Sequence, residues 1–176
     1  MSFQVGDKIV YPNHGVGIIE QINNWNVGVT PQRFYLLKIY ANSLRVMIPY
    51  SKVNTVGLRH IVKSKEVSQI LTYLARGECE NHKDWKYRFK ENSEKMRTGC
   101  LLQVAEVLKS LLVISQAKEL SFRERKMLDR ARYLLISELA VAKGTAEDTA
   151  ETLLTKALLK AQLKLIPNSM AMSASV

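Results

Sequence analysis

The chain has 176 residues, 47% of them hydrophobic and 24% charged, which fits one or two small folded domains. Its 26 lysines and arginines against 16 acidic residues give a net charge of +10, which suits a polyanionic partner, nucleic acid first and an anionic membrane surface second. Because no uncharged apolar run is long enough to span a bilayer, no secretory signal opens the chain and two cysteines make no disulfide framework, we expect a cytoplasmic protein.

Residues 1–60 carry the alternation and composition of β-strands. Short runs rich in β-branched and aromatic residues predict strands at 8–11, 16–22, 33–40 and 44–48. The turn cluster at 12–15 ends the first of these runs, and Pro49 ends the last. Short strands joined by turns with Gly and Pro predict a small, strongly bent sheet or barrel.

The last of these strands presents two different faces. Its apolar residues alternate with Arg45 and Met47, so one face is predicted to be buried and the other is free to meet a partner. Trp25 lies in an Asn-rich run that we interpret as a loop, where an indole is expected to be exposed or at an interface. An ordinary exposed edge strand is the alternative interpretation for Arg45 and Met47.

Residues 61–165 have helical periodicity. Ser64, the Ser121–Glu124 capping box and Thr145 are predicted helix starts, and Gly77, Gly99 and Gly144 are predicted ends. The remaining residues, 166–176, are expected to form a disordered tail. The inward residues of the resulting helical bundle are predicted to be Val67, Ile70, Leu71, Leu74, Phe89, Met96, Leu101, Val104, Leu108, Leu111, Leu112, Leu128, Ala131, Leu135, Leu139, Leu154, Ala157, Leu158 and Ala161.

Trp85 stands at the start of a predicted helix among cationic side chains. A large apolar side chain flanked by cations is what minor-groove wedge proteins push between base steps, while the cations hold the adjoining phosphates. Packing of the indole across the helix N-terminus into the core is the alternative. The neighbouring cations could equally form a solvated helix face.

Enzyme and metal chemistry find little support in the sequence. Cys79 and His82 have the spacing of half a zinc site, but Cys100 lies beyond a whole helix and the other histidines are in the strand region. There is no Gly-rich phosphate loop, paired carboxylate motif or nucleophile motif, so we expect no enzyme, no metal, no cofactor and no small-molecule substrate. A basic scaffold or membrane-surface module that binds an acidic partner remains the alternative function.

Several segments carry a family resemblance. Residues 5–17, with the sequence VGDKIVYPNHGVG, resemble the opening of the CarD/CdnL family of bacterial transcription regulators, and 46–49 with 56–59 resemble the close of the same domain. That domain is shared with transcription–repair coupling factors, whereas the helical half with its Trp is specific to CarD-like proteins. The helical half is similar at 84–90, 104–108, 120–132 and 138–140.

The resemblance implies an α+β protein with a Tudor-like N-terminal domain that docks on the β subunit of RNA polymerase. It also implies a C-terminal helical domain that touches promoter DNA. Family members place the Trp in the minor groove at the upstream edge of the melted bubble, which stabilises the open complex. A member would have low sequence specificity and would be associated with the nucleoid through the polymerase.

Carried over to this sequence, the resemblance implies DNA contacts by Trp85, Lys86, Tyr87, Arg88, Lys90 and Arg125. Lys90 matches a Lys in relatives, and Arg125 keeps the charge of a common Lys. Tyr87 stands where some relatives have Arg, so Lys86 and Arg88 are the candidate substitutes.

The resemblance also implies polymerase contacts by Trp25, Arg45, Met47 and Pro49. Trp25 and Met47 stand where some relatives have Arg. Arg45, on the same strand face as Met47, is therefore the candidate for the docking cation.

Overall fold

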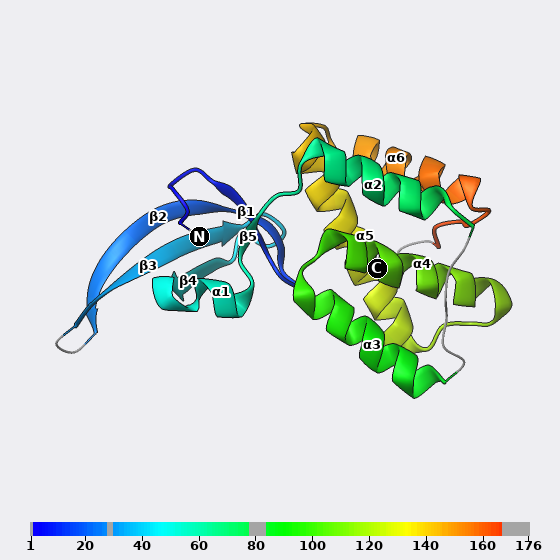
Figure 1. The fold of residues 1–176 in the computed structure, drawn as a ribbon, viewed down its shortest axis with the longest axis horizontal. Coiled ribbons are helices and arrows are strands. Elements are labelled where there is room, and N and C mark those ends of the chain that lie inside the picture. The colour runs from blue at the N-terminus through cyan, green and yellow to red at the C-terminus, as the bar shows by residue number, and fades with distance from the viewer. Residues whose placement is uncertain (1, 28–29, 78–83, 167–176) are drawn as a thin grey trace, which may run out of the picture. The chain divides into compact units, whose positions relative to one another are not determined.

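The computed structural model describes residues 2–27, 30–77 and 84–166 (Figure 1). The chain divides between Ile61 and Val62 into a unit of strands and a unit of helices. The fold class is α+β, as the sequence predicts. None of the described helices is long and apolar enough to cross a membrane.

The first unit is an open antiparallel sheet with the strand order β4-β3-β2-β1-β5. Two long strands, β2 and β3, form a curved hairpin in its middle (Figure 1). A register shift between Ile19 and Gln21 bends β2, as a bulge does. The sequence predicts a strongly bent sheet or a barrel, and the structure shows the bent sheet. The strands are β1 (Lys8–Tyr11), β2 (Gly15–Val27), β3 (Thr30–Ile39), β4 (Arg45–Pro49) and β5 (Arg59–His60).

One face of this sheet holds the core of the unit. Tyr35 is fully buried there, and its hydroxyl accepts a hydrogen bond from the Phe3 backbone N–H at 3.1 Å. A 3-10 turn, η1 (Tyr50–Lys52), and the short helix α1 (Val53–Val56) come directly after β4. The buried residues of this core are Phe3, Ile9, Ile19, Tyr35, Leu37, Ile48, Val53 and Leu58.

The Asn-rich run that contains Trp25 is part of β2, so the prediction of a loop there is wrong. Asn23 pairs with Phe34 and Trp25 pairs with Gln32 across the β2–β3 ladder. Asparagine has a low intrinsic strand propensity, but pairing with a partner strand outweighs it.

In its described residues the second unit is a bundle of five helices, in which α4 (Leu101–Ala117) packs against three of the others. The predicted inward residues are confirmed, except that Leu71 and Ala161 are only partly buried against the core and Phe89 is half-buried. The other helices are α2 (Ser64–Ala75), α3 (Trp85–Thr98), α5 (Phe122–Lys143) and α6 (Glu147–Lys160).

Two of the predicted helix caps are wrong and one is confirmed. The Ser121–Glu124 capping box forms at the start of α5. Ser64 is instead the first helical residue of α2, where the Glu66 carboxylate accepts from the Lys63 backbone N–H at 2.8 Å. At α6 the N-cap is Ala146 rather than Thr145.

The end of the described chain also differs from the prediction. Ile166 packs against the helical core, and its carbonyl accepts a hydrogen bond from Arg132 at 3.0 Å. It therefore does not belong to a tail. Residues 167–176 lie outside the described part of the chain.

Gly17 lets β2 approach β3 closely, and this generates a test. A Cβ at Gly17 would lie 2.6 Å from the Lys38 carbonyl oxygen, a backbone atom that cannot rotate away. Gly17→Ala should therefore lower the free energy of unfolding by about 1–3 kcal/mol, as overpacking does. Urea denaturation measures this, and Gly77→Ala is the matched control because nothing lies within 4 Å of its added Cβ. Equal stabilities of the two variants would contradict the prediction.

Candidate functional site

Trp85 is the first residue of α3 and lies on the surface, with 56% of its area exposed. The Asp84 carboxylate caps the helix by accepting from the Lys86 backbone N–H at 3.0 Å, which fixes the first turn. The Lys86 ammonium lies 5.9 Å from the centre of the indole ring. Core packing of Trp85, the alternative considered from the sequence, does not occur.

Arg88, one turn after Trp85, is not available at the surface. It is only 5% exposed, and its guanidinium is paired with the Glu124 carboxylate of α5 at 3.1 Å. The sequence-based assignment of Arg88 to DNA contact is therefore not supported, because periodicity along α3 cannot reveal a partner 36 residues away. Arg88 instead links α3 to α5 through the Glu124 carboxylate.

Glu124 connects the first turns of two helices. Its carboxylate accepts from the Ser121 backbone N–H at 3.0 Å and hydroxyl at 2.7 Å, as well as from Arg88. Burial raises the pKa of this carboxyl, but the Ser121 hydrogen bonds and the charge of Arg88 outweigh burial, so the pKa lies below its ordinary value. The N-terminal ends of α3 and α5 consequently lie at the same end of the helical unit (Figure 1).

Phe122 is a surface residue that the sequence reasoning missed. It is the first residue of α5 and is 73% exposed, and the Lys126 ammonium lies 4.5 Å from the centre of its ring. The sequence does contain a signal. Phe122 directly follows the capping residue Ser121, and it is not on the helix face of the inward residues Leu128 and Leu135.

We call this surface the aromatic end of the helical unit. Its other predicted members differ in access: Tyr87 and Lys90 are exposed, whereas Arg125 is half-buried. The aromatic end is made of Trp85, Lys86, Tyr87, Lys90, Phe122 and Lys126.

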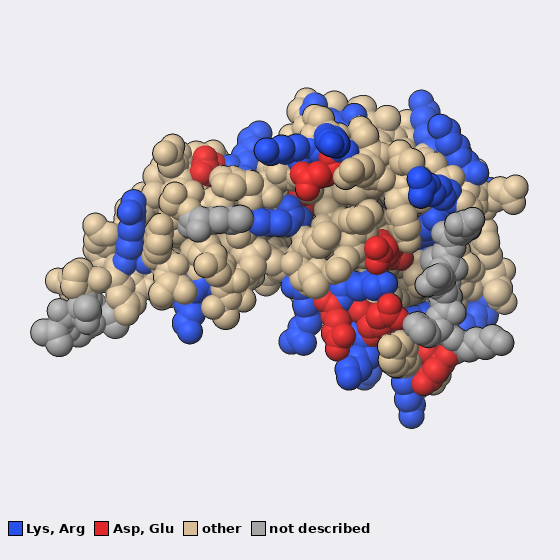
Figure 2. Space-filling view, viewed as in Figure 1, with Lys and Arg blue, Asp and Glu red and all other residues tan. Residues whose placement is uncertain are grey.

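The cations of the later part of α3 are partly neutralised. The Lys95 ammonium lies 3.1 Å from both the Glu91 and the Glu106 carboxylates. Acidic side chains lie among the cationic ones over α3 (Figure 2). The charge of Lys95 is therefore compensated by carboxylates of α3 and α4.

The four predicted polymerase-contact residues share one face of the sheet, opposite the core. Residues that pair across antiparallel strands point to the same side, so the pairs Leu36 with Met47 and Lys38 with Arg45 define this face. Trp25 joins it through β2 and is 54% exposed. We call it the outer face, made of Trp25, Phe34, Leu36, Arg45, Met47 and Pro49.

Arg45 is already engaged within the unit. Its Nε donates to the Glu20 carboxylate at 2.8 Å, and the Lys38 ammonium lies 3.8 Å from the same group. This hydrogen bond from Arg45 is the main cause of the lowered pKa of Glu20. A docking role for Arg45 would have to compete with that pair.

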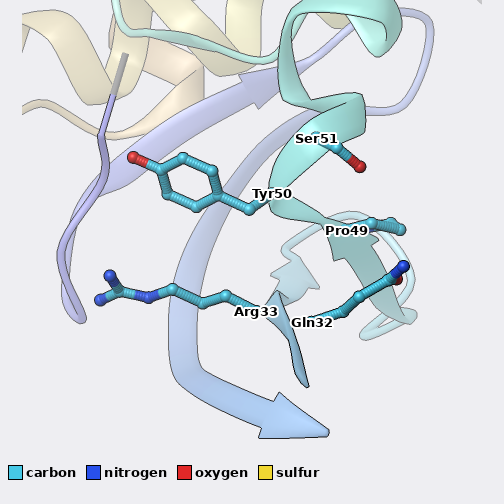
Figure 3. Close-up of a pocket in the computed structure, with 5 residues that line it drawn as sticks. All are labelled: Gln32, Arg33, Pro49, Tyr50 and Ser51. Atoms are coloured by element: carbon cyan, nitrogen blue, oxygen red, sulfur yellow. The ribbon is translucent and has the colours of Figure 1, made fainter. Parts of the chain in front are cut away.

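A hollow of about 280 Å³ lies beside the outer face, where β3 begins and β4 passes into η1 (Figure 3). Tyr50 forms one wall, and its ring stacks on the buried Tyr35 ring with centres 5.5 Å apart. The lining residues are Gln32, Arg33, Pro49, Tyr50 and Ser51.

No group of three or more His, Cys, Asp or Glu side chains among the described residues could hold a metal ion. Cys79 and His82, the half zinc site considered from the sequence, lie outside those residues. Cys100 is an exposed free thiol.

Both units are similar to known proteins of one family. Residues 3–62 match the family model of the CarD-like/TRCF RID domain, and residues 69–155 match that of the CarD C-terminal domain. A curated relative, "Putative transcription factor YdeB" of Bacillus subtilis (strain 168), is 39% identical over 82% of this chain and 95% of its own length. A solved structure, CdnLNt from Myxococcus xanthus, is 48% identical over 35% of this chain and 87% of that chain, with a TM-score of 0.31.

The buried pair predicts a strong effect of Glu124→Gln. Removing one charge leaves Arg88 buried without its carboxylate, so the free energy of unfolding at neutral pH should fall by roughly 3–5 kcal/mol. Glu91→Gln, which weakens a more exposed pair on α3, is the control and should cost less than about 1 kcal/mol. Urea denaturation of both variants measures the difference.

The same pair has a defined pH dependence. Because the folded pKa of Glu124 is below its ordinary value of 4.5, its stabilisation is complete above that pH and is lost as the pH falls below it. The stability difference between wild type and Glu124→Gln should therefore shrink between neutral pH and about pH 3. A difference that stays constant would show that the carboxylate charge is not its source.

Proposed function

The chain belongs to the CarD family of transcription factors, and we propose that it binds RNA polymerase through the outer face and promoter DNA through the aromatic end. In this proposal the β subunit is the polymerase partner and the upstream edge of the melted promoter is the DNA target. The protein stabilises the open complex and transfers no chemical group.

The observation that carries the DNA-binding proposal is an exposed indole on a helix turn whose backbone is fixed. Trp85 is positioned by the Asp84 cap and by the Arg88–Glu124 pair one turn away. A rigid aromatic side chain loses little conformational freedom on inserting between base steps. Lys86 lies beside the indole, Lys90 follows on the same helix and Lys126 lies over the Phe122 ring, and these ammonium groups can neutralise neighbouring phosphates.

A wedge of this kind favours open DNA because it binds distorted or unstacked base steps better than an intact duplex. A preference of about 1–3 kcal/mol shifts the equilibrium between open and closed complexes by roughly 5- to 150-fold. Phosphate contacts add affinity but little base specificity. The promoter preference then depends on how easily the junction unstacks.

The polymerase-binding proposal is supported by the outer face and by the match of residues 3–62 to the RID domain family. Trp25 and Met47 are exposed apolar side chains on a sheet that already has a packed core on its other side. Aromatic residues and Met are enriched at protein interfaces. The docking contact of this chain is accordingly more apolar than it would be with Arg at positions 25 and 47, as in some relatives.

A membrane-surface module is the competing function, and it requires an apolar stripe along an exposed helix face. In α3, the large exposed hydrophobic residues are Trp85 and Tyr87, both in the first turn. This arrangement favours a local wedge over a helix that lies in a membrane.

Trp85→Ala should shorten the lifetime of the open promoter complex by about 5- to 150-fold, which corresponds to the roughly 1–3 kcal/mol of base–aromatic stacking. Stability should be nearly unchanged, because truncation of a core Trp costs about 3–5 kcal/mol and Trp85 is not core. Phe122→Ala should act in the same direction with a smaller effect. Competitor-challenged decay of complexes on a promoter fragment measures the lifetime.

Leu159→Ala, which truncates another exposed apolar residue of the helical unit, is the control and should leave the lifetime unchanged. A Trp85→Ala protein that melts far lower, with normal complex decay once folding is corrected for, would refute the wedge.

Met47→Glu should weaken binding to the isolated β subunit at least about tenfold, because a carboxylate would be buried in an apolar contact. DNA binding by the same variant should remain at the wild-type level. Thr55→Glu adds the same charge on α1, away from the outer face, and is the matched control. Titration of each labelled variant with the β subunit measures the two affinities. Equal affinities of the two variants would place the docking surface elsewhere.

A further inference from the structure

The hollow beside the outer face has fixed apolar walls. Tyr50 is exposed at the hollow, but its ring is held by stacking on the buried Tyr35 ring. Pro49 adds a rigid ring to the lining. The volume of about 280 Å³ is just below the roughly 300–1,000 Å³ of small-molecule sites, and the hollow is open at the surface, so it suits a side chain better than a cofactor.

One cation lines this hollow. Arg33 and Tyr50 extend side by side in the same direction, and the guanidinium carbon lies 5.8 Å from the centre of the Tyr50 ring (Figure 3). Among the described residues no carboxylate forms an ion pair with Arg33, whereas Arg45 is held by Glu20 at 2.8 Å. Arg33 therefore offers a charge that the unit itself leaves uncompensated.

We propose that the hollow receives an acidic side chain of the protein that docks on the outer face, with Arg33 as the docking cation. The methylene groups of an Asp or Glu pack against Pro49 and the Tyr50 ring, and the carboxylate pairs with the guanidinium, a planar group suited to bidentate binding. This inference rests on the proposed binding of RNA polymerase and adds a specificity residue that lies outside the outer face.

The position of the hollow supports this occupant. Pro49 belongs both to the outer face and to the lining, and Gln32 of the lining pairs with Trp25 across β2 and β3. A partner that covers Trp25 and Pro49 therefore reaches the rim of the hollow at Gln32 and Pro49, and Arg33, which alternates with Gln32 along β3, lies across that rim. The chemistry also favours an acidic side chain over a nucleic-acid backbone, since a run of phosphates needs several cations and Arg33 is the one cationic residue that lines the hollow.

The test compares the full-length wild-type protein with Arg33→Glu, Arg33→Gln and Lys65→Glu in titrations against the purified β subunit. Lys65 is an exposed residue of α2 in the helical unit, so Lys65→Glu reproduces the charge change outside the unit that carries the hollow and the outer face. Arg33→Glu should weaken binding more than about tenfold and Arg33→Gln about 3- to 10-fold, because each loses a charge-assisted contact. Lys65→Glu should change the affinity by less than about twofold, as a charge outside the contact does.

Thermal melting of each variant separates a docking defect from a folding defect, and binding to promoter DNA is measured in parallel. Wild-type affinity of Arg33→Glu, together with weakened binding of Met47→Glu, would overturn the role of the hollow and leave the proposed function standing. Absence of β-subunit binding by the wild-type protein would overturn both. A loss of DNA binding by Arg33→Glu with normal β-subunit binding would assign Arg33 to nucleic acid instead.

Discussion

The aromatic end of the helical unit depends on one buried ion pair, between Arg88 of α3 and Glu124 of α5. A buried pair of this kind contributes little net stability, because desolvation of both charges offsets most of their attraction. Its effect is geometric: the carboxylate that completes the Ser121 cap also holds the first turn of α3. Trp85 and Phe122 each lie within one turn of the pair, so the pair fixes the backbone that carries both side chains.

The two tryptophans lie at the surface and take no part in either core. Both cores are built mainly from aliphatic residues, with Phe3 and Tyr35 as the aromatic members of the core of the strand unit. Trp25 and Trp85, the only two in the chain, lie more than half exposed, one in each unit. Leaving large apolar side chains in water costs solvation free energy, which a partner surface recovers on binding. Each unit therefore presents one surface suited to a partner.

Local pattern was enough to predict the α+β class, most helices and strands and the place of Trp85 at a helix start. It failed where the outcome depends on residues distant in sequence. Arg88 looks like its solvated neighbours until Glu124 is brought beside it, and the strand that contains Trp25 exists because β3 pairs with it. Phe122 was not predicted as a surface residue, because the capping motif before it predicts where a helix starts and not whether the next side chain is exposed.

Under the proposed function, the two units have to act together because neither surface is strong alone. Only Lys86, Lys90 and Lys126 of the aromatic end are placed for phosphate contact, and a few phosphate contacts give binding that moderate salt abolishes. A protein already docked on the polymerase meets the promoter at a high effective concentration, so a weak wedge is sufficient. Weak contact is also an advantage, since polymerase must leave the promoter. Selectivity then comes from the docking surface, where apolar side chains and one uncompensated arginine discriminate between protein partners better than phosphate contacts discriminate between sequences.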